Sequence, residues 1–145
     1  MNPNTSALLP AGVQVFQRGW LSSNNILLQD EDSTTLVDSG YFTHAAQTLA
    51  LVERALAGRP LDLLVNTHLH SDHCGGNAAL QAHYSKLRTL IPPGLAEPVQ
   101  HWRDEDLSYR PTGQNCPPFA IQGLLQPGST HRWAHTEWQV HAAPG

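Results

Sequence analysis

The chain has 145 residues, the length of one ordinary domain and enough for a single buried core. Hydrophobic residues make up 40% of it and charged residues 14%, which is typical of a globular protein and argues against intrinsic disorder. The formal net charge is −4 and the 8 Lys and Arg residues are scattered, so the composition also argues against an electrostatic nucleic-acid binder.

Three strands are predicted in the first forty residues. Residues 12–17 and 24–29 are strand-like, and the polar turn DEDS separates the second of them from TTLVDSG at 34–40. β-Branched Thr and Val side chains favour the third strand, and Ser39-Gly40 ends it. We therefore expect a meander in which an acidic turn joins the second and third strands.

A crossover to a buried strand is predicted next. Residues 44–57 are rich in Ala and Leu at helical spacing, with Thr43 as the expected N-cap and Gly58 and Pro60 ending the helix. Residues 61–67 form a short apolar run bounded by turn signals, which indicates a buried strand. The loop after such a strand leaves the carboxyl end of the sheet, where ligands and catalytic groups commonly lie.

The rest of the chain carries weaker helix and strand signals. The predicted segments are helices over 75–87 and 92–107, a loop over 108–119, and short strands over 119–125, 130–134 and 137–143. We expect Pro98 to interrupt the second helix and turns to lie at Pro127-Gly128 and near Thr136. There is no internal repeat or low-complexity segment, which favours a single α/β unit.

The loop after the buried strand carries the strongest chemical signal. His68, His70, Asp72 and His73 fall within six positions, and imidazole nitrogen and carboxylate oxygen are ligands that zinc and similar metals prefer. Their spacing is unsuited to one tetrahedral centre but suits two neighbouring ions. The first two histidines would hold one ion, and Asp72 with His73 would hold the other. A polar surface loop is the alternative, but it would need neither the buried strand before it nor the glycines at 75–76. We predict a paired metal site, where these glycines turn the backbone sharply and leave space for a substrate.

These residues resemble the H-x-H-x-D-H signature of the metallo-β-lactamase superfamily, which includes glyoxalase II-like thioesterases and lactonases. The resemblance covers THLHSDHCGGN, the earlier NNILLQDEDSTTLVDSG, which is similar to the family's first hairpin, and the order of the helix and strand between them. It implies an α/β fold of the αββα sandwich type, with residues 1–145 as a single partial domain that supplies the N-terminal βα half. Half a sandwich leaves an apolar sheet face and open edges, so we expect possible contacts between copies of the chain.

The resemblance also implies a role for each motif residue. His68 and His70 would hold the first of two zinc ions, and Asp72 and His73 would hold the second, with iron or manganese as alternative metals. Asp72 would also act in catalysis by orienting the attacking hydroxide. Asp38 would contact the ligands and hold them in orientation without binding the metal itself. The alternative, to which we give equal weight, is that Asp38 is an ordinary turn residue at the end of a strand.

The family's site requires more ligands than the motif provides. A histidine after a P-G pair, a bridging aspartate and a final histidine normally complete it, and Pro144-Gly145 resemble the start of the first of these elements. We therefore expect the remaining ligands to lie beyond residue 145. His141 is the best internal substitute, although a single strand histidine more often has a packing or surface role. The other histidines considered are His44, His83, His101, His131 and His135.

Three functions are compatible with these features. The favoured one is a metal-dependent hydrolase that uses a metal-bound hydroxide on an ester, thioester, lactone or amide bond of a small-molecule substrate. The first alternative is an iron-dependent oxidoreductase of the same fold, such as a persulfide dioxygenase or a di-iron flavoprotein partner, because histidine and carboxylate also suit iron. The second is a non-catalytic metal-binding module, which would bind metal weakly through two ligands per centre.

The expected location is the cytoplasm. The segment MNPNTSALLPAG lacks a basic region and a continuous apolar region, so we expect no signal peptide. No apolar run approaches the roughly 20 residues of a membrane span, so no membrane partner is expected. Cys74 and Cys116 are too few for a disulfide framework, and we expect two free thiols in a reducing compartment.

Overall fold

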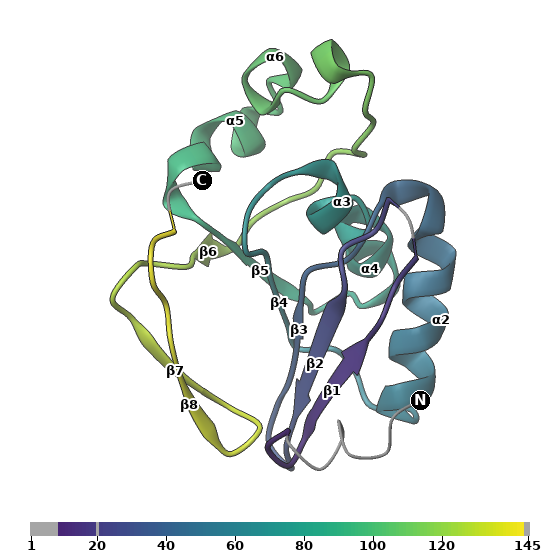
Figure 1. Ribbon diagram of the computed structural model, residues 1–145, viewed down its shortest axis with the longest axis vertical. Helices are drawn as coiled ribbons and strands as arrows, with labels where there is room; N and C mark the ends of the chain where they lie inside the picture. Colours follow the sequence, from purple (N-terminus) through teal and green to yellow (C-terminus); the bar gives the residue numbers. More distant parts are fainter. Residues whose placement is uncertain (1–8, 20, 144–145) are drawn as a thin grey trace.

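The computed structural model describes residues 9–19 and 21–143. It contains a six-stranded sheet in the order β1-β2-β3-β4-β5-β6 and a two-stranded hairpin, β7-β8 (Figure 1). The strands are β1 (Val13–Phe16), β2 (Asn25–Gln29), β3 (Thr34–Val37), β4 (Leu63–Val65), β5 (Arg88–Ile91), β6 (Gly123–Leu124), β7 (Thr130–Trp133) and β8 (Thr136–Gln139). The helices are α2 (Ala45–Leu56), α3 (Ser71–Cys74), α4 (Asn77–His83), α5 (Ala96–His101) and α6 (Asp104–Leu107), with 3-10 turns η1 (Phe42–His44), η2 (Pro93–Leu95) and η3 (Arg110–Thr112).

The first three strands form the predicted meander. β1 pairs antiparallel with β2, and β2 pairs antiparallel with β3. The side chain of Asp30 closes the acidic turn by accepting hydrogen bonds from the backbone N–H groups of Asp32 and Ser33. β3, β4 and β5 run parallel, and α2 is the crossover between the first two of them. The carboxyl ends of these three strands therefore lie at one edge of the sheet.

The main apolar core lies between the sheet and two helices. Leu27, Leu36 and Leu64, from three neighbouring strands, are fully buried in one cluster with Val52 and Leu56 of α2. Helix α4 packs beside α2 and contributes Leu80 to the same cluster. Each such side chain stabilises the fold by about 1.5–3 kcal/mol when it is buried, so this layer holds the parallel strands and their shared edge in place.

A second apolar cluster joins the motif to the segment at residues 108–119, which we call the covering segment. Its buried members are Leu69, Cys74, Ile91, Val99, Leu107, Tyr109, Cys116 and Phe119. The covering segment was predicted as a loop, and the structure shows only the 3-10 turn η3 within it. It is therefore held in place mainly by side-chain contacts with the motif.

Several predicted elements in the middle of the chain differ from the structure. Strand β5 was not predicted, because its four residues lie between two apparent helices and its buried face is completed only by the neighbouring parallel strands. Pro98 does not interrupt a helix, since it lies in the first turn of α5, where its missing N–H is not needed. The break between α5 and α6 is at Trp102, whose φ of 46° is left-handed.

Element boundaries near the two ends of the chain also needed correction. Thr43 lies inside η1, and α2 follows His44 without any side-chain cap. The strand predicted over 119–125 is reduced to β6. The turn expected near Thr136 is confirmed: it lies at Ala134 and His135, where both residues have positive φ, as a two-residue hairpin requires. None of the described helices is long and apolar enough to cross a membrane.

Gly75 and Gly76 have a different role from the one predicted. Their φ values of −63° and −90° are ordinary, so the turn itself does not require glycine. Instead, a Cβ on Gly75 would lie 2.5 Å from the backbone nitrogen of Phe42, and a Cβ on Gly76 would overlap the carbonyl of Ser39. The absence of both side chains lets α3 and α4 pack against the backbone after β3. Protein therefore fills the space that we expected to be open for a substrate.

We predict that Gly76→Ala lowers the free energy of unfolding by about 1–3 kcal/mol, because the backbone of Ser39 or of α4 must move to admit the Cβ. Gly94→Ala is the matched control, since a Cβ there meets nothing within 4 Å. Urea unfolding of both variants measures the difference. Equal stability of the two variants would contradict the proposed close contact.

Candidate metal centre

The motif begins directly after β4, and its second half forms α3 rather than the expected loop. Backbone hydrogen bonds connect this helix to the segments that precede β2 and follow β3. The carbonyl of Asp72 accepts from the N–H of Ser23 at 2.9 Å, and the carbonyl of His73 accepts from the N–H of Ser39 at 2.7 Å. The sheet therefore fixes the backbone position of both residues.

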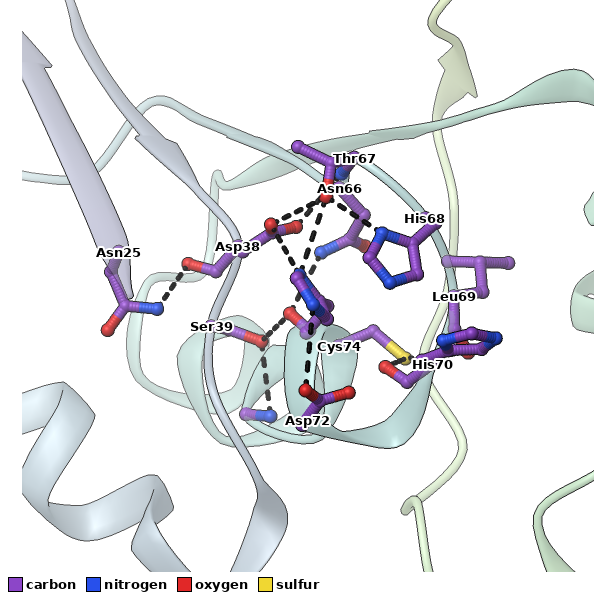
Figure 2. A network of polar contacts seen from close by, with 12 residues as sticks. Asn25, Asp38, Ser39, Asn66, Thr67, His68, Leu69, His70, Asp72 and Cys74 are labelled. Atoms are coloured by element: carbon purple, nitrogen blue, oxygen red, sulfur yellow. Dashed lines mark hydrogen bonds and ion pairs between the residues drawn. The ribbon is translucent and has the colours of Figure 1, made fainter. Parts of the chain in front are cut away.

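Asp38 lies at the centre of the polar contacts beneath the motif (Figure 2). It is 4% exposed, and its φ of 61° is uncommon for a residue other than glycine. Its Oδ1 accepts from the backbone N–H of Thr67 at 2.9 Å, and its Oδ2 accepts from the Thr67 hydroxyl at 2.7 Å and lies 2.8 Å from Nδ1 of His73. Its carbonyl accepts from Asn25 at 3.1 Å. These contacts favour the supporting role for Asp38 over a simple strand-end turn.

The same contacts determine which nitrogen two of the imidazoles present to a metal. Nδ1–H of His73 donates to Asp38. Nδ1 of His68 lies 3.1 Å from the Thr67 hydroxyl oxygen, whose proton is donated to Asp38, so this nitrogen is also the donor. In the neutral form of each ring the lone pair is therefore on Nε2, as metal ligation through that atom requires.

The charge states of these two histidines are shifted in opposite directions. Burial lowers the pKa of His68, and the neighbouring His73 and His70 lower it further, which favours the neutral form that binds metal. Burial also acts to lower the pKa of His73, but its hydrogen bond to Asp38 and the charges of Asp38 and Asp72 outweigh this effect and raise it. Metal binding at His73 would therefore displace a proton that Asp38 helps to retain.

The four predicted ligands lie close together. The His68 ring centroid is 4.7 Å from that of His70 and 3.8 Å from that of His73. Nε2 of His73 lies 3.6 Å from Oδ2 of Asp72. Two ligand atoms of a tetrahedral ion with bonds of about 2.0–2.2 Å are roughly 3.3–3.6 Å apart, so this pair fits a single ion. Among the described residues no three donors form a group around one metal position, and the assignment of two ligands to each of two ions stays a prediction.

The other histidines have neighbours outside the motif. The pairs are His44 with Ser22, His83 with Glu53, His131 with Trp133, and His135 with Glu31. His101 and His141 are exposed. Within the described part of the chain none of them joins a group of three metal donors, including His141, the preferred internal substitute. The P-G pair at 144–145 lies outside the described residues.

Two hollows open beside Asp72. The larger, of about 500 Å³, is lined by Leu21, Tyr41 and Gln114 among others, and the smaller, of about 180 Å³, is lined by His70 and Gln114 among others. Asp72 borders both hollows, and 44% of its side chain is exposed. Sequence reasoning missed these lining residues, because they lie in loops without a motif and reach the site only through the fold.

A family model described as the metallo-beta-lactamase superfamily matches residues 18–145. The chain belongs to this superfamily. The hydroxyacylglutathione hydrolase of Stenotrophomonas maltophilia (strain R551-3) is 37% identical over 67 residues, which are 46% of this chain and 24% of that protein. The recognition of the family from the motif and its flanking strands is thereby confirmed.

Solved metallo-beta-lactamases have the same fold. FEZ-1 from Legionella gormanii matches with a TM-score of 0.76 at 14% identity, over 94% of this chain and 52% of that one. BJP-1, a subclass B3 enzyme of Bradyrhizobium japonicum, matches with a TM-score of 0.71 at 16% identity, over 94% and 51%. The chain spans about half the length of these solved superfamily members. The predicted α/β fold of the metallo-β-lactamase type is confirmed, and the metal ligands stay a prediction.

We predict that Asp38→Asn lowers the free energy of unfolding by about 1.5–3 kcal/mol, because an amide cannot accept all the hydrogen bonds that the buried carboxylate accepts. We also expect metal affinity to fall about 10–100-fold, since His73 and Thr67 lose their common partner. Urea unfolding without metal and zinc titration measure the two effects.

Asp32→Asn is the matched control, because it makes the same chemical change on an exposed turn of the same hairpin. Its stability and its zinc affinity should equal those of the wild type. If Asp38→Asn behaved like this control, Asp38 would be an ordinary turn residue.

Proposed function

We propose that the protein is a metal-dependent hydrolase of a small-molecule ester, thioester, lactone or amide, and that this chain supplies one part of its active site. The observation that carries the proposal is the convergence of His68, His70, Asp72 and His73 at the carboxyl end of a parallel strand, next to an open hollow. Ligand-type side chains that remain partly exposed on a rigid support are typical of a catalytic metal site rather than a structural one.

In this proposal His68 and His70 hold one ion, and Asp72 and His73 hold a second. The donor set of imidazoles and a carboxylate suits zinc, with iron or manganese as alternatives. The bound ions would supply the Lewis acidity that activates water and polarises the substrate carbonyl. The remaining donors are proposed to come from outside the described residues, because within them no third donor joins either pair.

The side chains around the hollows have complementary parts in this proposal. Asp72 is suited to hold the proton of an attacking water, because its carboxylate is half-exposed and borders both hollows. Tyr41 and Gln114 line the larger hollow and can hydrogen-bond polar groups of a substrate, while Leu21 offers an apolar contact. Asp38 acts only through Thr67 and His73, by holding the ligands in orientation.

A thioester is the first substrate class to test. The Stenotrophomonas maltophilia relative is named as a hydroxyacylglutathione hydrolase, and it shares 37% identity over the matched region. The volume of about 500 Å³ beside Asp72 is within the range of small-molecule sites. We further propose a cytoplasmic protein without a nucleic-acid or membrane partner, whose half-buried sheet residues such as Ile26 and Val37 allow contact with another copy.

The test uses the full-length protein purified without added metal. We expect bound zinc and hydrolysis of a hydroxyacylglutathione thioester, with a lactone and a β-lactam assayed in parallel. Asp72→Asn should lower kcat about 10²–10⁴-fold, as expected for loss of a group that handles the proton, and it should also reduce the metal content.

Asp106→Asn is the matched control, because Asp106 is exposed and pairs with Arg103 outside the motif. It should retain both metal and turnover. Stoichiometric iron with dioxygen consumption would favour an oxidoreductase instead. Metal binding without turnover of any of the three substrates would favour a non-catalytic module, and either result would contradict the proposal.

A further inference from the structure

The two cysteines of the chain meet beneath the motif. Cys74 ends α3 and Cys116 lies in the covering segment, 42 positions away, yet their sulfur atoms are 3.8 Å apart. Both are free thiols, as predicted, with Cys74 0% and Cys116 8% exposed. No function considered so far uses this pair.

The thiols are part of a hydrogen-bond chain that ends at the motif. The Tyr109 hydroxyl donates to the carbonyl of Leu69 at 2.7 Å. Its oxygen can therefore only accept from the Cys74 thiol, whose sulfur lies 3.2 Å away and is also within reach of the carbonyls of Leu69 and His70; the sulfur of Cys116 lies next to that of Cys74. Leu69 lies between His68 and His70. This series of hydrogen bonds therefore connects the thiol pair to the backbone that carries two predicted ligands.

One side of the thiol contact is fixed more firmly than the other. Helix α3 is held in place by two sets of contacts. The N–H of Ser39 donates a hydrogen bond to the carbonyl of His73, and the backbone of Gly75 packs closely against the backbone at Phe42. The covering segment is attached through isolated side chains, among them Gln114, which accepts a hydrogen bond from Ser71. A shortening of the sulfur–sulfur distance would therefore move the covering segment rather than α3.

We propose that Cys74 and Cys116 form a reversible disulfide that locks the covering segment onto the metal motif. The sulfur atoms need to approach by about 1.8 Å from their present contact to reach the bonded distance of about 2.05 Å. A small-molecule disulfide such as oxidised glutathione is the oxidant. Cys116, the more exposed thiol, attacks it and releases one reduced glutathione; Cys74 then attacks the Cys116 sulfur of the mixed disulfide and releases the second.

In this exchange the two cysteines lose two electrons and two protons, and the glutathione disulfide gains them. The new bond closes a ring between positions that are 42 apart and removes the thiol proton that Tyr109 accepts. Because Gln114 of the covering segment borders both hollows, the disulfide also fixes their shared wall. The device would leave the covering segment held only by non-covalent side-chain contacts in a reducing compartment and fasten it covalently under oxidation.

The full-length protein is incubated in buffers with increasing ratios of oxidised to reduced glutathione and is then alkylated, digested and mapped by mass spectrometry without reduction. We expect the peptides that contain Cys74 and Cys116 to be joined, with the loss of two hydrogen atoms. The oxidised protein should melt roughly 5–10 °C higher than the reduced one, because the cross-link restricts the unfolded chain. A reductant should reverse both changes.

Cys116→Ala and Cys74→Ala should show neither the cross-link nor the rise in Tm. If either variant fails to fold, the cross-link and the Tm of the oxidised and reduced wild-type protein still test the proposal. Three outcomes would overturn the proposal. Both thiols could be alkylated at every glutathione ratio, each cysteine could stop at its own mixed disulfide with glutathione, or the cross-link could form without a rise in Tm. These measurements do not use hydrolysis, so their outcome is independent of the proposed activity.

Discussion

The buried carboxylate of Asp38 is the interaction on which the candidate site depends. It follows β3, yet its oxygens contact Thr67 after β4 and His73 in α3, and thereby join three separate elements. A left-handed backbone at a residue other than glycine costs about 1–2 kcal/mol, whereas hydrogen bonds to a charged group contribute about 1.5–3 kcal/mol each. The contacts therefore outweigh the strain, and the position of the motif follows from the position of this one side chain.

The sequence was sufficient to predict those parts of the structure whose signals are local. The four motif side chains lie within six positions and are close together in the fold, and the meander and its crossover follow from short apolar runs separated by turns. The role of Asp38 could not be decided in this way, because its partners lie 29 and 35 positions away. The glycines after the motif were misinterpreted for a related reason: the backbone that excludes a Cβ belongs to the turn that follows β3.

The covering segment shows a second limit of sequence reasoning. SYRPTGQNCPPF has no periodic pattern, and a loop prediction was correct as far as secondary structure is concerned. Its order instead comes from three side chains, Tyr109, Gln114 and Cys116, that contact the motif separately. A loop that is held by side chains rather than by backbone ladders can be released locally without unfolding the sheet, which is a useful property for a wall of a binding site.

The candidate ligands of the motif are held by their neighbours to different degrees. The rings of His68 and His73 are held through Asp38, directly or by way of Thr67, so little entropy remains to be lost when their Nε2 atoms bind an ion. The carboxylate of Asp72 is half-exposed and lies 3.6 Å from Nε2 of His73. Two imidazoles held by hydrogen bonds, beside a carboxylate that lies partly in solvent, would divide the two tasks of such a site. In the proposed function the rings would define where the ions sit, and the carboxylate would remain available to accept a proton.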